Sequence, residues 1–124
     1  MKTALFALSV LAIAAPALGR DRPVPVATPD GKAIDCISTN NIRETKVRSD
    51  SVIDFVTRDG KVYRNTLDGQ CPQLGFEERF AYKVSTNQLC SVDLITVLTS
   101  PGLSRGASCG LGQFQPVKLD KPAR

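Results

Sequence analysis

The sequence predicts an all-β fold: a small antiparallel meander of about six strands, either a twisted sheet or a small barrel, that is stapled by disulfides. Short runs rich in β-branched and aromatic residues are separated by turn residues at intervals of about ten residues. Four cysteines lie along the chain behind an apolar N-terminal stretch that is typical of an export signal. The helical pattern is limited to one turn around residues 74–79.

The first residues of the chain, 1–19, have the pattern of a signal peptide. Lys2 supplies a positive charge, an apolar run follows, and Ala17-Leu18-Gly19 places small side chains at a cleavage site. We expect cleavage between Gly19 and Arg20, because Pro16 disfavours the alternative cut after Ala17. The apolar run is shorter than the ~20 residues of a membrane-spanning helix. The sequence therefore predicts a periplasmic or secreted protein with no membrane span after cleavage, and the alternative is an uncleaved anchor.

The next segment, residues 20–32, is expected to be a flexible leader. It is rich in proline and has few bulky apolar side chains, so it buries too little surface to offset the entropy cost of ordering. Residues 118–124 are expected to fray for the same reason. The β domain is therefore expected over residues 33–117. Because a domain of this size buries only about 60–65% of its unfolded surface, covalent cross-links should contribute strongly to its stability.

Turn residues divide the expected β domain into strands. Ser49-Asp50 ends the first strand, Asp59-Gly60 joins the second to the third, and Ser85-Thr86-Asn87 ends the fourth. A long loop with glycine and proline precedes the last strand, which glycines also interrupt. In chain order, the expected strands cover residues 42–48, 52–57, 61–67, 79–84, 88–98 and 108–117.

The hairpin at Asp59-Gly60 has a register that the sequence can predict. A two-residue loop would place Phe55 opposite Arg64, which is a poor cross-strand pair. A three-residue loop, with Gly60 in the left-handed conformation as a bulge, places Phe55 opposite Tyr63. The same register places Asp54 opposite Arg64. Such aromatic and opposite-charge pairs contribute about 0.2–1 kcal/mol each, so we expect the bulged register.

This register divides the side chains of the hairpin between two faces. Ile53, Phe55 and Tyr63 share the face that we expect to pack in the core. The other face carries Val52, Asp54, Val56, Val62 and Arg64. That second face is not fully polar, which indicates that it is partly covered, as the wall of a closed barrel or a partner-binding surface would be.

Export to an oxidising compartment predicts that Cys36, Cys71, Cys90 and Cys109 form disulfides. In the meander, Cys36 and Cys90 lie at one end of the strands, and the other two cysteines lie at the opposite end. Strands of about eight residues separate these ends by about 26 Å, whereas a disulfide needs Cα atoms about 4.4–6.8 Å apart. We therefore expect the pairs Cys36–Cys90 and Cys71–Cys109. The alternative, Cys36–Cys71, requires residues 38–41 to fold back along the first strand.

The charge and composition of the chain exclude several function classes. The chain has 16 Lys and Arg and 12 Asp and Glu, a net charge of +4, and its basic residues are scattered among acidic ones. Nucleic-acid binding needs a clustered basic face, so we expect no nucleic-acid partner. The absence of histidine removes the commonest general base and metal ligand. The cysteine spacing does not match a zinc site, and we expect no metal and no cofactor.

Carboxylates are the remaining candidates for catalysis. Those in the expected domain include Asp35, Asp54, Glu77, Glu78 and Asp93. Two carboxylates about 5–10 Å apart could hydrolyse a glycoside, but no flanking signature supports this and we assign no catalytic residue. Asp93 interrupts an apolar strand and is expected to accept hydrogen bonds from backbone N–H groups or from a basic neighbour. Gly110-Leu111-Gly112 is interpreted as a strand bulge rather than a phosphate-binding loop.

Several short motifs together carry a resemblance to a known family. They are Cys36-Ile37, Val62-Tyr63-Arg64-Asn65-x-Leu67, Cys71-Pro72-x-Leu74, Phe80-x-Tyr82, Leu89-Cys90-x-x-Asp93-x-Ile95 and Cys109-x-Leu111-Gly112-x-Phe114. Over about residues 35–117 the chain resembles a family of small exported Gram-negative bacterial proteins of unknown function with four cysteines. The resemblance implies a periplasmic setting, but it implies no activity and no functional residue.

These features predict an exported, disulfide-stabilised β domain that acts as a non-enzymatic binding or accessory protein of the cell envelope. Its partner is expected to be a protein or a small molecule, whose identity the sequence does not indicate. An envelope protein with purely structural contacts fits the same features. The alternative is a small carboxylate-dependent hydrolase, which would need a concave pocket with two convergent carboxylates.

Overall fold

The computed structural model describes residues 23–120, so the predicted signal peptide with its Gly19–Arg20 cleavage site and residues 121–124 lie outside the described residues. The strands are β1 (Ala27–Pro29), β2 (Cys36–Ser38), β3 (Ile42–Val47), β4 (Val52–Thr57), β5 (Val62–Thr66), β6 (Phe80–Tyr82), β7 (Gln88–Cys90), β8 (Leu94–Thr99), β9 (Ser104–Gly110) and β10 (Phe114–Leu119). The helical elements are the 3-10 turn η1 (Thr39–Asn41) and the single-turn helix α1 (Leu74–Glu77). The predicted all-β class is confirmed.

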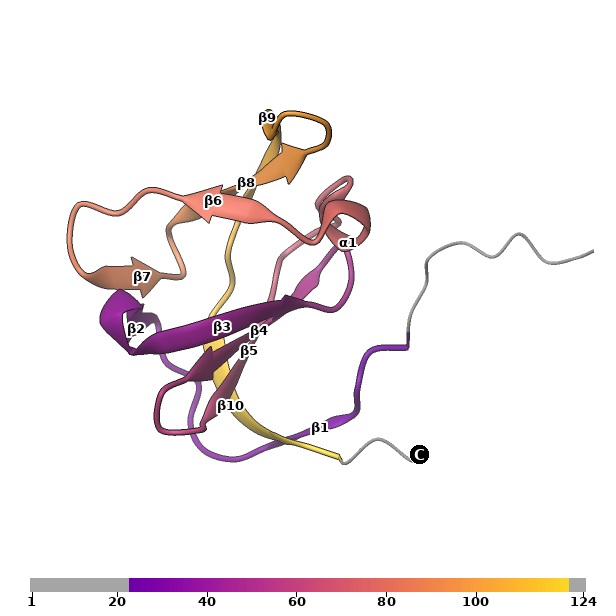
Figure 1. Ribbon diagram of the computed structural model, residues 1–124. Coiled ribbons are helices and arrows are strands. Elements are labelled where there is room, and N and C mark those ends of the chain that lie inside the picture. Colours follow the sequence, from indigo (N-terminus) through magenta and orange to yellow (C-terminus); the bar gives the residue numbers. More distant parts are fainter. Residues whose placement is uncertain (1–22, 121–124) are drawn as a thin grey trace, which may run out of the picture.

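The strands form three antiparallel sheets (Figure 1). The largest sheet has the order β1-β10-β5-β4-β3, a three-stranded sheet has the order β6-β8-β9, and β2 pairs with β7. In Figure 1, β6 and β8 lie above β3, β4 and β5, and β2 and β7 lie at the left. The predicted meander holds over β3, β4 and β5, after which the chain builds the three-stranded sheet and returns with β10 beside β5. Across residues 23–120 these sheets do not close into a barrel.

The β4–β5 hairpin adopts the predicted bulged register. Its cross-strand pairs are Val52–Thr66, Ile53–Asn65, Asp54–Arg64, Phe55–Tyr63 and Val56–Val62. Gly60 has a φ of +86°, a left-handed conformation that favours glycine. Its N–H donates to the carbonyl of Thr57 at 3.0 Å, which closes the loop. The cross-strand pairs predicted from the sequence are therefore confirmed.

The hydrophobic core lies between the five-stranded sheet and the β6-β8-β9 sheet. Its fully buried members include Ile53 and Phe55 of β4, Leu89 of β7, Ile95 and Val97 of β8 and Phe114 of β10. The ring of Phe55 makes edge-on contacts with Phe114 at 5.3 Å and with Phe80 at 6.3 Å between centroids. Tyr63 packs against this cluster as predicted. Burial of each large apolar side chain stabilises the fold by about 1.5–3 kcal/mol.

Both predicted disulfides are present. Cys36 in β2 lies directly opposite Cys90 in β7 and is bonded to it. Cys71, which follows β5, is bonded to Cys109 in β9 and so joins the segment after the five-stranded sheet to the three-stranded sheet. The alternative pair Cys36–Cys71 is excluded. Each bridge closes a loop long enough to stabilise the fold by roughly 4 kcal/mol in the chain-entropy account.

The fifth predicted strand, residues 88–98, is wrong as a single strand because a turn divides it into β7 and β8. The carboxylate of Asp93 accepts a hydrogen bond from the N–H of Cys90 at 2.7 Å. The N–H of Asp93 in turn donates to the carbonyl of Cys90 at 3.0 Å. Asp93 therefore accepts a hydrogen bond from a backbone N–H group, as the sequence predicts. The turn that this hydrogen bond stabilises ends β7 before β8 begins. As a result, β7 pairs with β2, and β8 pairs with β6 and β9.

The sixth predicted strand, residues 108–117, also comprises two strands, and β9 begins inside the predicted long loop. Gly112 marks a close crossing rather than a bulge, since a Cβ there would clash with the carbonyl oxygen of Thr66. The buried side chain of Asn65 binds both backbone groups of Gly112. Asn65 Oδ1 accepts from the N–H at 2.8 Å, and Asn65 Nδ2 donates to the carbonyl at 2.7 Å. This contact directs the chain from one sheet into the other.

The segment predicted to be a flexible leader contains an edge strand, β1, that pairs with residues 117–119 of β10. Two residues expected to fray, Lys118 and Leu119, therefore lie in a sheet. Backbone hydrogen bonds from Asp30 to Pro116 and from Asp120 to Val26 flank the paired residues. Prolines restrict the unfolded segment to extended conformations and so lower the entropy cost of pairing. An edge strand also tolerates the missing N–H of proline.

Candidate functional site

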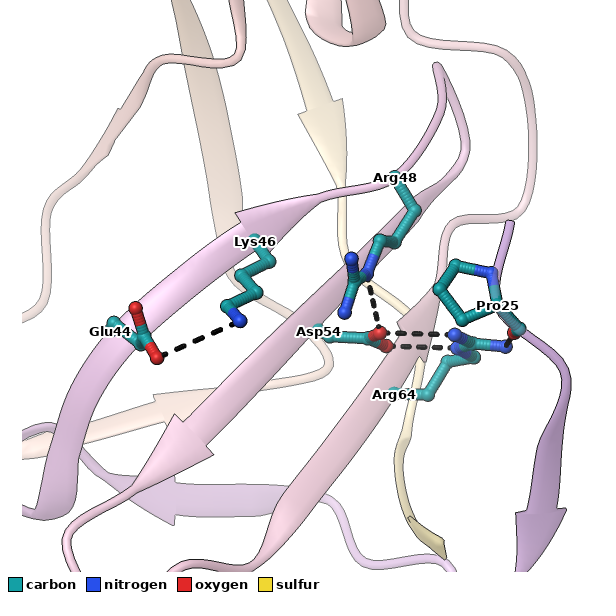
Figure 2. Close-up of polar contacts among 6 residues, drawn as sticks. All are labelled: Pro25, Glu44, Lys46, Arg48, Asp54 and Arg64. Carbon is teal, nitrogen blue, oxygen red and sulfur yellow. Dashed lines mark hydrogen bonds and ion pairs between the residues drawn. The ribbon is translucent and has the colours of Figure 1, made fainter. Parts of the chain in front are cut away.

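A cluster of charged side chains lies on the outer face of the five-stranded sheet, and Asp54 is at its centre (Figure 2). The Asp54 side chain is 0% exposed. Its two carboxylate oxygens accept hydrogen bonds from Arg64, Nε at 2.8 Å and Nη2 at 3.0 Å, and Arg48 Nε donates to Oδ2 at 2.9 Å. We call Arg48, Asp54 and Arg64 the Asp54 cluster.

Because side chains alternate along a strand, the Asp54 cluster lies on the face of the sheet that points away from the core. Ile53 and Phe55 of β4 point into the core, so Asp54 between them points outward. Arg64 lies directly opposite Asp54 on β5 and therefore shares its face. On β3, Lys46 is also opposite Asp54, but its ammonium group lies 3.9 Å from the carboxylate of Glu44 instead. Figure 2 shows this second contact beside the cluster.

The Asp54 cluster is suited to holding the fold together rather than to catalysis. Both carboxylate oxygens are occupied by guanidinium donors and are shielded from solvent, so a substrate has no access to them. Arg64 also donates through Nη1 to the carbonyl of Pro25 at 2.9 Å. The cluster therefore fastens the segment before β1 onto the sheet. The sequence predicts that the hairpin face carrying Asp54 and Val56 is partly covered. The burial of both residues confirms this prediction.

The other candidate carboxylates form hydrogen bonds in separate parts of the fold. Asp35 accepts a hydrogen bond from Gln113 Nε2 at 2.9 Å. Glu77, at the end of α1, accepts from the hydroxyl of Ser100 at 2.8 Å. Glu78 follows it in a left-handed backbone conformation. The structure therefore distributes these residues over different elements, and Asp93 is the member of the set that lines the groove described next.

An open groove of about 450 Å³ crosses the outer face of the β6-β8-β9 sheet. It is lined by Ala81, Tyr82, Lys83, Val92, Asp93, Leu94, Thr96, Leu98, Leu103, Arg105 and Ser108. Because Ile95 and Val97 of β8 point into the core, the residues alternating with them face the groove. The hydroxyl groups of Thr96 and Ser108 lie 2.9 Å apart in the groove wall.

The groove combines exposed apolar side chains with two cations. Val92 is 86% exposed, Leu94 is 59% exposed and Leu103 is 53% exposed. Within residues 23–120, neither Lys83 nor Arg105 forms an ion pair or a side-chain hydrogen bond. Chemically, the groove suits a ligand that has both an apolar part and a negative charge.

Asp59 lies in the loop of the β4–β5 hairpin, and its carboxyl group has a lowered pKa. The hydroxyl of Thr57 donates to its carboxylate, which holds the pKa of Asp59 below its ordinary value of 3.8. Asp59 is exposed and is not part of the groove wall. The shift therefore belongs to the stability of the hairpin rather than to a reactive site.

Within the described part of the chain, no three residues among His, Cys, Asp and Glu are grouped so that they could hold a metal ion. That part also has no helix with the length and apolar character needed to cross a membrane. No protein-family model, curated protein or solved structure matches the chain.

The sequence-based interpretation assigns no binding residue and so misses the groove. One signal is visible in β8, where Leu94 and Leu98 are apolar on the face opposite Ile95 and Val97. A strand with apolar residues on both faces is covered on both faces or binds something. The sequence does not indicate that Arg105 lines the groove, because it predicts a loop for this segment. The structure instead shows Arg105 in β9.

Proposed function

We propose that the protein is an exported, disulfide-stabilised β domain of the cell envelope that binds a partner and does not catalyse a reaction. The two disulfides support export, because such bonds persist in oxidising compartments. The resemblance over about residues 35–117 supports the same periplasmic, Gram-negative setting.

The observation that carries the proposal is the exposure of apolar side chains around the groove. Val92, Leu94 and Leu103 lie in its wall and remain largely open to solvent. Exposed apolar side chains that gather around a hollow, with polar groups at its rim, are typical of interaction sites. Covering them would release about 25 cal/mol for each Å² of apolar surface removed from water.

The hydrolase alternative has less support. Hydrolysis of a glycoside needs two carboxylates on either side of the scissile bond. Among the residues that line the described groove, Asp93 alone carries a carboxylate. Its Oδ2 atom accepts a hydrogen bond from the backbone N–H of Cys90. The wall otherwise consists of cationic, hydroxyl and apolar side chains. This composition favours binding over acid–base chemistry.

Photo-cross-linking in living cells tests the proposal. A photoreactive phenylalanine derivative would replace Leu94 in one variant and Leu103 in another, both of which line the groove. We expect both variants to yield the same covalent adduct after irradiation. The matched control carries the derivative at Lys46, which is half-exposed on the five-stranded sheet.

The proposed function predicts no such adduct from the Lys46 position. Absence of an adduct from both groove positions would contradict it. An identical adduct pattern from the groove and from Lys46 would also contradict it, because the contact would then be non-specific. Mass spectrometry of a specific adduct would identify the partner class.

A further inference from the structure

We propose that the groove, together with the free edge of β9, binds an extended peptide segment of a partner protein that alternates apolar and acidic side chains. The segment pairs with β9 as an added strand, and its outward side chains lie beside the groove. This inference rests on the proposed function, since it names the kind of partner that the groove accepts.

The first argument is a comparison of the sheet edges in residues 23–120. Strand β9 covers Ser104–Gly110 and pairs with β8 on one side only. The other edge strands are β3, β1 and β6 in the two large sheets. Strands β1 and β6 have three residues each, and β1 contains a proline. Short strands and proline are devices that prevent edge pairing.

Strand β3 is protected in a different way. It has six residues, and Arg43, Glu44 and Lys46 place three charges along its length. Both β3 and β9 contain a register shift, so a bulge does not distinguish them. In β9, Arg105 is the one charged residue, and the other side chains are small. Among the described edges, β9 is therefore the longest and the least protected against strand addition.

The second argument is the position of the groove relative to this edge. Ser108 and Arg105 of β9 lie in the groove wall, and Leu103 precedes the strand in the same wall. A strand added beside β9 would bring alternate side chains to within about 5 Å of these residues. A carboxylate would then meet Arg105, and an apolar side chain would meet Leu103.

Charge complementarity selects the acidic peptide over a second copy of this chain. Arg105 of β9 has no ion-pair partner within residues 23–120, so the strand beside the added peptide carries an unneutralised cation. Pairing of β9 with the β9 strand of another copy would bring a second Arg105 to the same region. A partner strand with a carboxylate beside Arg105 neutralises that cation instead.

The third argument is that the β9 edge is held in place before binding. Cys109 joins β9 to the segment after β5 through a disulfide, and its backbone pairs with Ile95 in the core-facing strand β8. An edge that is already fixed loses little conformational entropy when a peptide pairs with it. The affinity then comes from main-chain hydrogen bonds, and the selectivity comes from the groove.

The test uses a designed peptide, Ac-Thr-Val-Thr-Glu-Thr-Val-Thr-NH2, titrated into the oxidised, 15N-labelled protein and followed by NMR. Its glutamate and valines share one face of an extended strand. Two isomers each carry three backbone N-methyl groups, one on the two valines and the glutamate and the other on the last three threonines. In strand pairing only every second N–H points to the partner strand. One isomer should therefore bind at least about tenfold more weakly than the other.

The amide shifts of the unmodified peptide complex should concentrate on Ser104–Gly110. Arg105→Glu should weaken binding by about fivefold, and a peptide with lysine in place of glutamate should regain binding to that variant. The matched control is Arg43→Glu, which makes the same charge change on the exposed β3 edge. It should leave the affinity unchanged.

Equal binding of the two methylated isomers would overturn strand addition, as would shifts on β3 or no binding by any peptide. A dimer of the purified protein that pairs through β9 would also overturn it. These results are separate from the cross-linking result. A specific cross-link from Leu94 and Leu103 without peptide binding would leave the proposed function intact and show that its partner is recognised in another way.

Discussion

Asp54 and Arg64 face each other across the β4–β5 hairpin, and two hydrogen bonds of 2.8 and 3.0 Å join the buried carboxylate to the guanidinium group. Arg64→Met should therefore destabilise the protein by about 3 kcal/mol, because it leaves a buried charge with one arginine partner. Arg48→Met should cost about 1 kcal/mol, since Arg48 supplies one hydrogen bond to Asp54. Urea denaturation measures both values. Equal losses would contradict the assignment of Arg64 as the main partner.

Gly60→Val should destabilise the hairpin by about 1–2 kcal/mol because valine resists the left-handed conformation. A Cβ at Gly60 would meet no atom within 4 Å, so the expected cost is conformational and not steric. Gly69→Val is the matched control, since Gly69 also has open space around it but lacks a positive φ. Thermal unfolding of both variants compares the two losses of stability. A comparable loss from Gly69→Val would refute the role given to the Gly60 backbone.

Gly112→Ala should cost about 3 kcal/mol, because the new Cβ would clash with the backbone carbonyl oxygen of Thr66. The displacement would also disturb the two hydrogen bonds with Asn65. Gly110→Ala provides the comparison, since its Cβ would lie at an ordinary 3.9 Å from Leu94. Chemical denaturation should show little change for Gly110→Ala. A tolerated Gly112→Ala would mean that the crossing is looser than described.

Thr57→Val should raise the pKa of Asp59 toward 3.8, because it removes the hydroxyl that donates to the carboxylate. In the wild type the folded pKa lies below the unfolded value. The carboxylate therefore stabilises the fold at pH values above the unfolded pKa, and this contribution is lost as the pH falls through the folded pKa. An NMR titration of the Asp59 carboxyl carbon measures the midpoint in both proteins. The same midpoint in both would rule out the Thr57 contact as the cause.

The sequence contains enough local information to predict the β4–β5 hairpin. Both disulfide pairs are also predicted correctly, although the six-strand meander from which they are derived holds only over β3, β4 and β5. Cross-strand pairs such as Phe55–Tyr63 are short-range, and turn chemistry at Gly60 fixes their register. The number of strands is harder to predict. The division between β7 and β8 depends on the backbone hydrogen bond accepted by Asp93, which a continuous apolar pattern conceals. Strand β1 depends on a distant partner, β10, that no local pattern reveals.

The groove could not be predicted either, because it depends on contacts between strands that are distant in the sequence. Its wall combines Lys83 after β6, Leu94 in β8 and Arg105 in β9, and only the order of the strands in the sheet brings them together. The burial of Asp54, in contrast, follows from the mixed polarity of its strand face and the arginine opposite it. Sequence periodicity indicates which face a residue occupies, but it does not indicate which faces of distant strands meet.

We propose that this chain, which is held by two disulfides, is exported, and the intact mass of the protein recovered from cells tests this proposal most directly. The mass is measured with thiol-alkylating label before and after reduction, and non-reducing peptide mapping gives the connectivity. We predict a chain that begins at Arg20, takes up label only after reduction, and yields the peptides Cys36–Cys90 and Cys71–Cys109. A chain that retains residues 1–19, or that labels at cysteine without reduction, would contradict the account.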